Sequence, residues 1–416
     1  MLDFAKRKIC ANQLTNIMKG IAALAPTLLL TLILTSCMSD GYTDTAAGKS
    51  DTYINLNVST PTAQARANAP AGSTAGTSGT LKENETFPNP IDEEKIYSIR
   101  VWAFKSGPNE NAMPIGFKAV TGLNKTGSYN VSMKLRKTAG KPENIDLYIL
   151  LNAESIGVLE GKDCIKMTRA ELEALVIKNN FGIANGTAQT TVVPDAGLPI
   201  SRVIKELDVT NNIKDNATEA AQHSIHIPLI RAVSKLHFFF TRKDVKDTEG
   251  VEVTKIEVNE NVIPTQSSVF PTATTYANKE TDGLTGNLTS LTYLNDEKMT
   301  FGGVATGDIK PVADPTWYIR KSDQTAEDYI TQLRGATTEC YLSYLRETGK
   351  ELTGTIYFKL SKNGAKKQKT FSISNAYRNH EMVVYGYFLG DGESTLTLNY
   401  YVANWNEKGA TNIEFN

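Results

Sequence analysis

The clearest alternation of apolar and polar residues near the beginning of the chain covers residues 52–59, Thr-Tyr-Ile-Asn-Leu-Asn-Val-Ser. Ile54, Leu56 and Val58 occupy every second position, and this period of two predicts a strand with one buried face. A long stretch of Ala, Gly, Ser, Thr and Pro without apolar periodicity follows, and Arg66 is its lone arginine. A strand connected through such a segment could be cut off and replaced by another strand.

A basic segment and an apolar run open the chain. The run covers residues 20–33 and is closed by Leu34-Thr35-Ser36-Cys37. Small residues directly before a cysteine, after a run too short to span a bilayer, resemble the lipobox of bacterial lipoproteins. Residues 1–36 are therefore predicted to be a lipoprotein signal peptide, with Cys37 as the lipidated first residue; translation could start at Met1 or at Met18. The alternative is a single membrane anchor with an incidental cysteine.

Many short segments carry strand patterns, and turn signals separate them. Pro228 interrupts the apolar stretch 225–241, which predicts two strands or one strand that changes sheets. Asn363-Gly364 is a strong hairpin signal between two apolar segments. The other predicted strands are 95–104, 129–135, 145–152, 251–258, 356–360, 370–374, 382–389, 395–402 and 412–415.

One clear helix start interrupts the strands. Thr168 and Glu171 have the spacing of a capping box, and Leu172, Leu175 and Val176 would form the apolar stripe of the helix. Short strands with frequent turns and one short helix predict an all-β fold of two tandem β-sandwiches. The predicted divisions are a removable strand and tether (37–66), a flexible linker (67–94), an N-terminal sandwich (95–228) and a C-terminal sandwich (229–416).

Charge and cysteine content bear on two questions: whether the protein binds nucleic acid and whether it contains a disulfide. The chain has 44 basic and 45 acidic residues and a formal net charge of −1, so there is no electrostatic reason to expect a nucleic-acid partner. Cys164 and Cys340 are far apart in the sequence and lack the spacing of a disulfide framework. We therefore expect two buried free thiols, with a disulfide between them as the alternative.

No motif in the sequence points to catalysis, a cofactor or a metal. His223 and His226 are three positions apart in a segment with a strand pattern, where they would face opposite sides of a sheet. Nucleophile elbows, phosphate-binding glycine loops and zinc-protease signatures are all missing from the sequence. A glycosidase carboxylate pair could be hidden among the acidic residues, but nothing selects one. We expect no enzyme activity, no cofactor and no metal site.

Taken together, these features resemble the fimbrillins of Bacteroidales, the lipoprotein pilins of type V pili. The order of the matching motifs spans essentially the whole chain after the signal, although the long Ala/Gly/Ser/Thr linker departs from the family pattern. The motifs are the lipobox at Cys37, the strand 52–59, Arg66-Ala67-Asn68, Ser98–Phe104, Leu150–Ala153, Arg231–Leu236, Tyr377–His380, Val402–Asn406 and Ile413–Phe415.

The resemblance implies that the protein is a structural subunit of a cell-surface fimbria, located in its shaft. It also implies that the subunit consists of two transthyretin-like sandwiches. It implies export as an outer membrane lipoprotein precursor, cleavage between Arg66 and Ala67 by an arginine-specific protease, and assembly with other copies and related fimbrial subunits. Ile54, Leu56 and Val58 would plug a groove until cleavage, after which another subunit's C-terminal strand enters it by β-strand addition. The donor residues would be Leu396, Leu398, Tyr400 and Val402, or Ile413 and Phe415.

Three alternatives remain at this point. The strand 52–59 could be a permanent edge strand, with Arg66 a solvated linker residue. The protein could be a non-polymerising surface lipoprotein or tip adhesin that binds a host glycan or protein. It could also be a surface hydrolase.

Overall fold

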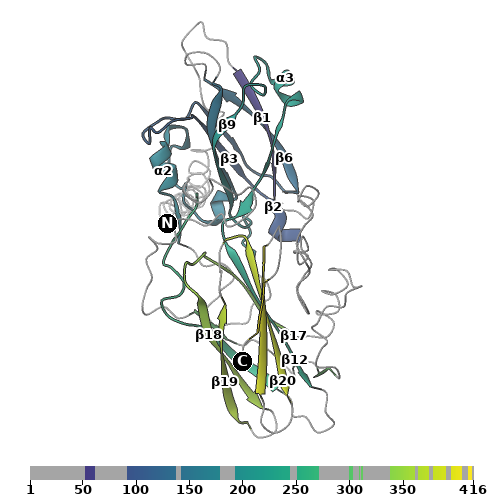
Figure 1. Ribbon diagram of the computed structural model, residues 1–416. Coiled ribbons are helices and arrows are strands. Elements are labelled where there is room, and N and C mark those ends of the chain that lie inside the picture. The colour runs from purple at the N-terminus through teal and green to yellow at the C-terminus, as the bar shows by residue number, and fades with distance from the viewer. Residues whose placement is uncertain are drawn as a thin grey trace, which may run out of the picture.

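In a computed structural model, the described part of the chain consists mostly of strands (Figure 1). The structure describes residues 52–60, 91–136, 142–178, 193–243, 251–270, 299–302, 309, 311–312, 338–360, 364–373, 378–389, 395–404 and 411–414. The predicted all-β class is confirmed. Among the described residues, no helix has the length and apolar character needed to span a membrane.

Eight strands form one sheet in the upper part of Figure 1. They are β1 (Thr52–Ser59), β3 (Ile99–Lys105), β4 (Gly116–Val120), β6 (Ser128–Leu135), β7 (Asn144–Leu151), β9 (Ile200–Asp208), β10 (Ile225–Pro228) and β11 (Ile230–Arg231). Their order is β10-β1-β6-β4-β3-β7-β9-β11. Only the β1–β10 pair is parallel; the other neighbours in this sheet are antiparallel.

The eight-stranded sheet curls around its own core. Ile54 and Leu56 of β1 share one apolar cluster with Leu147 of β7 and Ile200 of β9. In a flat sheet these strands would lie several strand widths of about 4.8 Å apart. β10 and β11 stand at the two ends of the strand order, yet only Leu229 separates them along the chain. The two ends of the sheet therefore come together, which the right-handed twist of strands favours.

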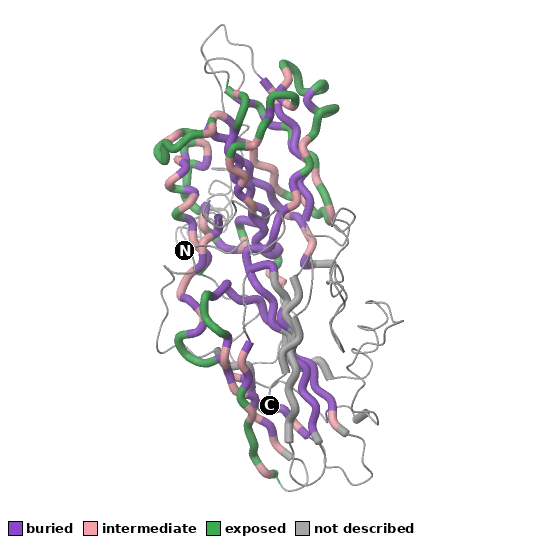
Figure 2. The backbone as a smooth tube through the Cα atoms, viewed as in Figure 1, coloured by how far each residue is buried: buried purple, intermediate pink, exposed green. Residues whose placement is uncertain are grey.

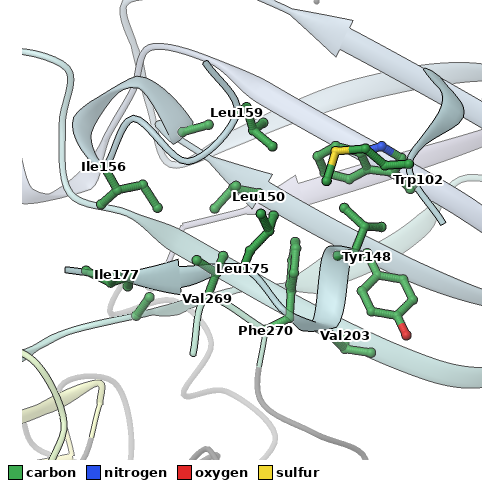
Figure 3. Packing of buried hydrophobic residues seen from close by; sticks show 14 of the residues in the cluster. Trp102, Tyr148, Leu150, Ile156, Leu159, Leu175, Ile177, Val203, Val269 and Phe270 are labelled. Carbon is green, nitrogen blue, oxygen red and sulfur yellow. The ribbon is translucent and has the colours of Figure 1, made fainter. Parts of the chain in front are cut away.

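The middle of this sheet is buried on its other face as well. Trp102 and Tyr148 point away from the first cluster into a second one with Phe270, and the indole Nε1 of Trp102 donates to the Cys164 carbonyl at 2.7 Å (Figure 3). The cover comes from the segment after β7, with η3 (Ala153–Ser155), η4 (Cys164–Lys166), α2 (Arg169–Glu173) and β8 (Val176–Ile177), and from β14 (Ser267–Ser268), which pairs with β8.

The predicted capping box is confirmed. The Thr168 hydroxyl accepts from the Glu171 N–H, and the Glu171 carboxylate accepts from the Thr168 N–H at 2.7 Å. The helix ends at Glu173, so only Leu172 of the predicted apolar stripe lies on it, and Val176 lies in β8. The structure also contains the helix α3 (Ala217–Gln222), which the sequence pattern did not predict. This helix packs on β1.

Two further sheets enclose an apolar core in the C-terminal half. One contains β12 (Ser234–Lys243), β16 (Pro311–Val312), β17 (Thr338–Leu345), β20 (His380–Leu389), β21 (Thr395–Asn404) and β22 (Thr411–Glu414). The other contains β13 (Val251–Val258), β15 (Met299–Gly302), β18 (Leu352–Leu360) and β19 (Lys366–Ile373). Phe238 of the first sheet packs on Phe371 of the second within this core. Figure 2 shows buried residues along the described parts of both sheets.

Two local predictions about strands are confirmed. β18 and β19 pair as an antiparallel hairpin, and Gly364 beside its turn has the positive φ of 66° that glycine tolerates. The stretch 225–241 changes sheets: β10 and β11 belong to the eight-stranded sheet, whereas β12 belongs to the C-terminal half. The predicted strand 95–104 is divided in two, because β2 (Lys95–Ile96) pairs with β5 (Lys125–Thr126) before β3 begins.

The end of the predicted linker is an ordered anchor. Residues 91–94 form the 3₁₀ helix η2 (Ile91–Glu94), and the Glu93 carboxylate is fully buried. It lies 3.0 Å from the ammonium of Lys235 in β12 and accepts a hydrogen bond of 2.5 Å from the Tyr344 hydroxyl in β17. Glu93 therefore ties the chain that follows the linker to the C-terminal half.

The expectation of a free thiol at Cys164 is wrong, because this buried cysteine is disulfide-bonded. Spacing along the chain does not decide such a bond, because bridging requires only that two Cα atoms come within roughly 7 Å of each other in the fold.

Candidate functional site

Strand β1 lies inside the eight-stranded sheet and is not an edge strand. On one side it pairs antiparallel with β6 along its whole length, from Thr52 opposite Leu135 to Ser59 opposite Ser128. On the other side, its residues 56–59 pair in parallel with β10. The alternative of an edge strand is therefore wrong for this structure.

The inner face of β1 carries the predicted plug residues. Ile54, Leu56 and Val58 each have 0% exposure and pack in the first cluster. The space that β1 fills is called the β1 slot here; its apolar lining includes Val131, Met133, Leu135, Ile213 and Ile227. Burying each plug side chain contributes about 1.5–3 kcal/mol, so the strand is held by several kcal/mol of apolar contact.

The outer face of β1 carries a row of polar side chains. The Asn57 amide nitrogen donates to Oδ1 of Asn130 on β6 at 2.7 Å. Oδ1 of Asn57 lies 3.0 Å from Nδ1 of His226 on β10. Because a carbonyl oxygen only accepts, Nδ1 of His226 carries the proton in this arrangement. Asn130, Asn57 and His226 face one another directly in the strand register, and they are called the polar row below.

A second polar contact lies beside the row. The Asn55 amide nitrogen donates to the Ser224 hydroxyl at 3.0 Å, and Asn55 is buried. The Ser59 hydroxyl lies 3.5 Å from Nε2 of His226, at the limit of a hydrogen bond. The outer face of the slot therefore offers specific polar partners at two positions in addition to main-chain pairing.

Backbone hydrogen bonds fasten both ends of β1. Tyr53 and Lys214 exchange two backbone bonds of 2.7 and 3.0 Å. At the other end, Thr60 donates from its N–H to the Gly127 carbonyl at 2.7 Å, and the Leu229 N–H donates to the Ser59 carbonyl at 2.9 Å. The last of these bonds comes from beyond residue 228, where the N-terminal sandwich was predicted to end.

The remaining predicted site residues lie elsewhere or outside the described chain. Cys37, Arg66, Ala67 and Phe415 fall outside the described residues. Leu396, Leu398, Tyr400 and Val402 belong to β21, which pairs with β20, and Ile413 belongs to β22, which pairs with β21. The structure thus places the predicted plug and the predicted donor in different sheets.

Sequence reasoning missed the polar partners of β1. The sequence pattern raises His226 only as a possible metal ligand and draws no attention to Asn130 or Ser224. The polar half of the alternation in residues 52–59 was the available signal, because a strand with two asparagines on its outer face invites side-chain hydrogen bonds. Groups of three or more potential metal ligands do not occur among the described residues.

Comparison with known proteins gives structural likeness only. No family model matches the chain, and no curated protein matches it in sequence. The chain is similar in structure to fimbrial proteins of Bacteroidales. The tip fimbrial protein Mfa3 of Porphyromonas gingivalis is 13% identical, with a TM-score of 0.43, over 85% of this chain and 100% of that one.

Two other solved structures have similarly low sequence identities and TM-scores. A fimbrial assembly protein of Parabacteroides distasonis is 12% identical, with a TM-score of 0.38, over 87% of this chain and 100% of that one. The fimbrial anchor protein Mfa2 of Porphyromonas gingivalis is 10% identical, with a TM-score of 0.35, over 86% and 100%. Likeness at this level assigns neither partners nor a position within a fimbria to this chain.

Proposed function

We propose that this protein is a structural subunit of a cell-surface fimbria, assembled when a protease cuts after Arg66 and a strand from another subunit replaces β1. One observation carries the proposal. β1 fills a complete position in the sheet, yet the sequence connects it to the next described residues only through residues 61–90, which contain Arg66.

The energetics favour a switch at this connection. While the chain is intact, β1 competes for the slot as part of the same molecule, at a high effective concentration. After cleavage, only hydrogen bonds and apolar contacts hold β1, so a strand from another subunit can compete on equal terms. Main-chain pairing on both sides then supplies affinity, and the inner pockets supply register.

Export as a lipoprotein and the absence of catalysis are part of the same proposed role. Lipidation at Cys37 would hold the precursor at the outer membrane, and Cys37 precedes the cleavage point, so cleavage would release the rest of the chain from its anchor. The work of the subunit is strand pairing, which needs no catalytic residue, cofactor or metal. Its partners are other copies, related fimbrial subunits and an arginine-specific protease.

Substitution of Arg66 tests the proposal. Arg66→Ala should leave a folded, lipidated monomer at the cell surface that forms no ladder of multimers on electrophoresis without boiling. The matched control is Lys82→Ala, which removes a positive charge from the same connecting segment but leaves the arginine bond intact. Its ladder should equal that of the unsubstituted protein.

The N-terminal sequence of the shed protein gives an independent readout, because it should begin at Ala67. Filaments of normal length from Arg66→Ala cells would contradict the proposal.

A further inference from the structure

The polar row beside β1 makes demands that few side chains meet. Asn57, between Asn130 and His226, donates a hydrogen bond to one strand and accepts one from the other. Asparagine does both with a short side chain. A carboxylate cannot donate to the amide oxygen of Asn130, and an aliphatic side chain can do neither. A strand that enters the slot with asparagine at this position is therefore favoured over the same strand shifted in register.

The sequence offers one other segment with the pattern of β1. Around Asn57, large apolar residues stand at positions −3, −1 and +1, in Ile-Asn-Leu-Asn-Val. The same arrangement of large apolar residues (Val, Ile, Leu, Met, Phe, Tyr, Trp) around an asparagine occurs at one other place, Leu396-Thr397-Leu398-Asn399-Tyr400. In that alignment Thr397 takes the place of Asn55 beside Ser224.

We infer that the polar row is the register-reading device of the β1 slot, and that the strand it selects is Leu396–Tyr400 of a second copy, with Asn399 in the place of Asn57. This inference rests on the proposed function, since it names the strand that replaces β1. It distinguishes between the two C-terminal segments that the sequence leaves open.

Main-chain pairing makes the exchange feasible. In its own chain, β21 pairs with β20 over residues 395–404 and with β22 over residues 399–402. In the slot, a strand pairs with β6 over the positions of residues 52–59 and with β10 over those of 56–59. A donor that leaves one two-sided position enters another, so most of its backbone hydrogen bonds are replaced.

Disulfide trapping in assembled filaments tests the identity and register of the donor. With Asn399 in the row, Tyr401 falls opposite exposed Ser128, as Ser59 does now. The double variant Ser128→Cys and Tyr401→Cys should therefore form a covalent link between subunits. Ser128→Cys with Val402→Cys, shifted by one residue and pointing to the other face, is the matched control and should not.

Ser128→Cys with Asn416→Cys tests the competing donor, with Ile413 in the place of Leu56. A link from this pair, with none from Tyr401→Cys, would overturn the inference while leaving strand exchange in place. Filaments that form without cleavage at Arg66 would overturn both this inference and the proposed function.

Substitutions in the receiving subunit test the row itself without altering the donor. Asn130→Leu and His226→Leu change exposed residues, so the fold should survive, and monomer elution and denaturation checks this. Each should slow assembly after cleavage about tenfold, as expected for the loss of one hydrogen bond that aligns the strand. The control is Ser132→Leu, an exposed residue of β6 outside the row. Equal assembly rates for all three variants would show that the row does not read register.

Discussion

β1 and β3 are both buried central strands of the same sheet, yet they differ in what holds them. Trp102 of β3 packs in one apolar cluster and Val101 in the other, so both faces of that strand are packed by specific side chains. β1 contributes Ile54, Leu56 and Val58 to a single cluster and presents polar side chains on its other face. The chain continues from β3 to β4 through residues 106–115, whereas the longer stretch of residues 60–90 separates β1 from η2.

The difference shows what makes a buried strand replaceable. A strand packed on both faces cannot be substituted without rebuilding two cores. A strand packed on one face can be replaced by any segment with the same alternation and the right outer residue. Depth of burial does not separate these cases, because the inner residues of both strands have 0% exposure.

The largest expected effect tests β3. Trp102→Ala removes a fully buried side chain that contacts Phe117 and Phe270, and it should lower the free energy of unfolding by about 3–5 kcal/mol. The loss should be the same before and after cleavage at Arg66, because β3 stays in place. Urea denaturation of both forms measures it, with exposed Lys105→Ala as the control. A loss that disappears on cleavage would break the distinction between the strands.

The next largest loss of stability is expected at Glu93 in η2. This residue marks the end of the N-terminal segment that can be removed. Glu93→Gln removes the carboxylate charge from the buried ion pair between Glu93 and Lys235, which should cost about 3 kcal/mol. Denaturation measures this loss, and Lys350→Gln is an exposed control. In the unsubstituted protein, limited proteolysis after cleavage at Arg66 should trim the new N-terminus no further than η2. Trimming into β2 would place the boundary later in the chain.

In β1, a substitution should lower stability by a similar amount, but only while β1 occupies its slot. Leu56→Ala should lower the unfolding free energy of the uncut protein by about 2–4 kcal/mol, because its side chain fills the slot. Once the tether is cut and β1 has been replaced in filaments, the substitution should have no effect on filament stability. Persistent destabilisation of the filaments would mean that β1 remains in its slot.

The smallest effect concerns α2, which forms part of the cover over β3. Thr168→Ala removes the N-cap of α2 and should cost about 1 kcal/mol at neutral pH, as measured by urea denaturation.

The same cap should respond to pH. Hydrogen bonds from the Thr168 N–H and hydroxyl lower the pKa of Glu171 in the folded protein. The ionised Glu171 carboxylate therefore stabilises the fold at pH values above its pKa in the unfolded state. The contribution is lost as pH falls through the lower folded-state pKa. The stability difference between the unsubstituted protein and Glu171→Gln should therefore shrink in acid, and a constant difference would contradict this origin.

Local patterns in the sequence determined several parts of this protein. The alternation at 52–59 predicted β1 and its buried face, the spacing of Thr168 and Glu171 predicted the helix start, and Pro228 predicted the change of sheets. Each of these features depends on residues within a few positions of one another. Side-chain direction, capping and the missing proline N–H are properties of such short segments.

Only the tertiary structure decided which segments became neighbours. Asn57 meets His226, Glu93 meets Lys235, and β1 has β10 as a parallel partner, although long stretches of chain separate the members of each pair. Cys164 formed a disulfide that its spacing did not suggest, and α3 came to rest on β1. The physical reason is that an alternating strand fits equally well beside many others. The burial of the whole apolar set selects among these pairings, and no single segment carries that information.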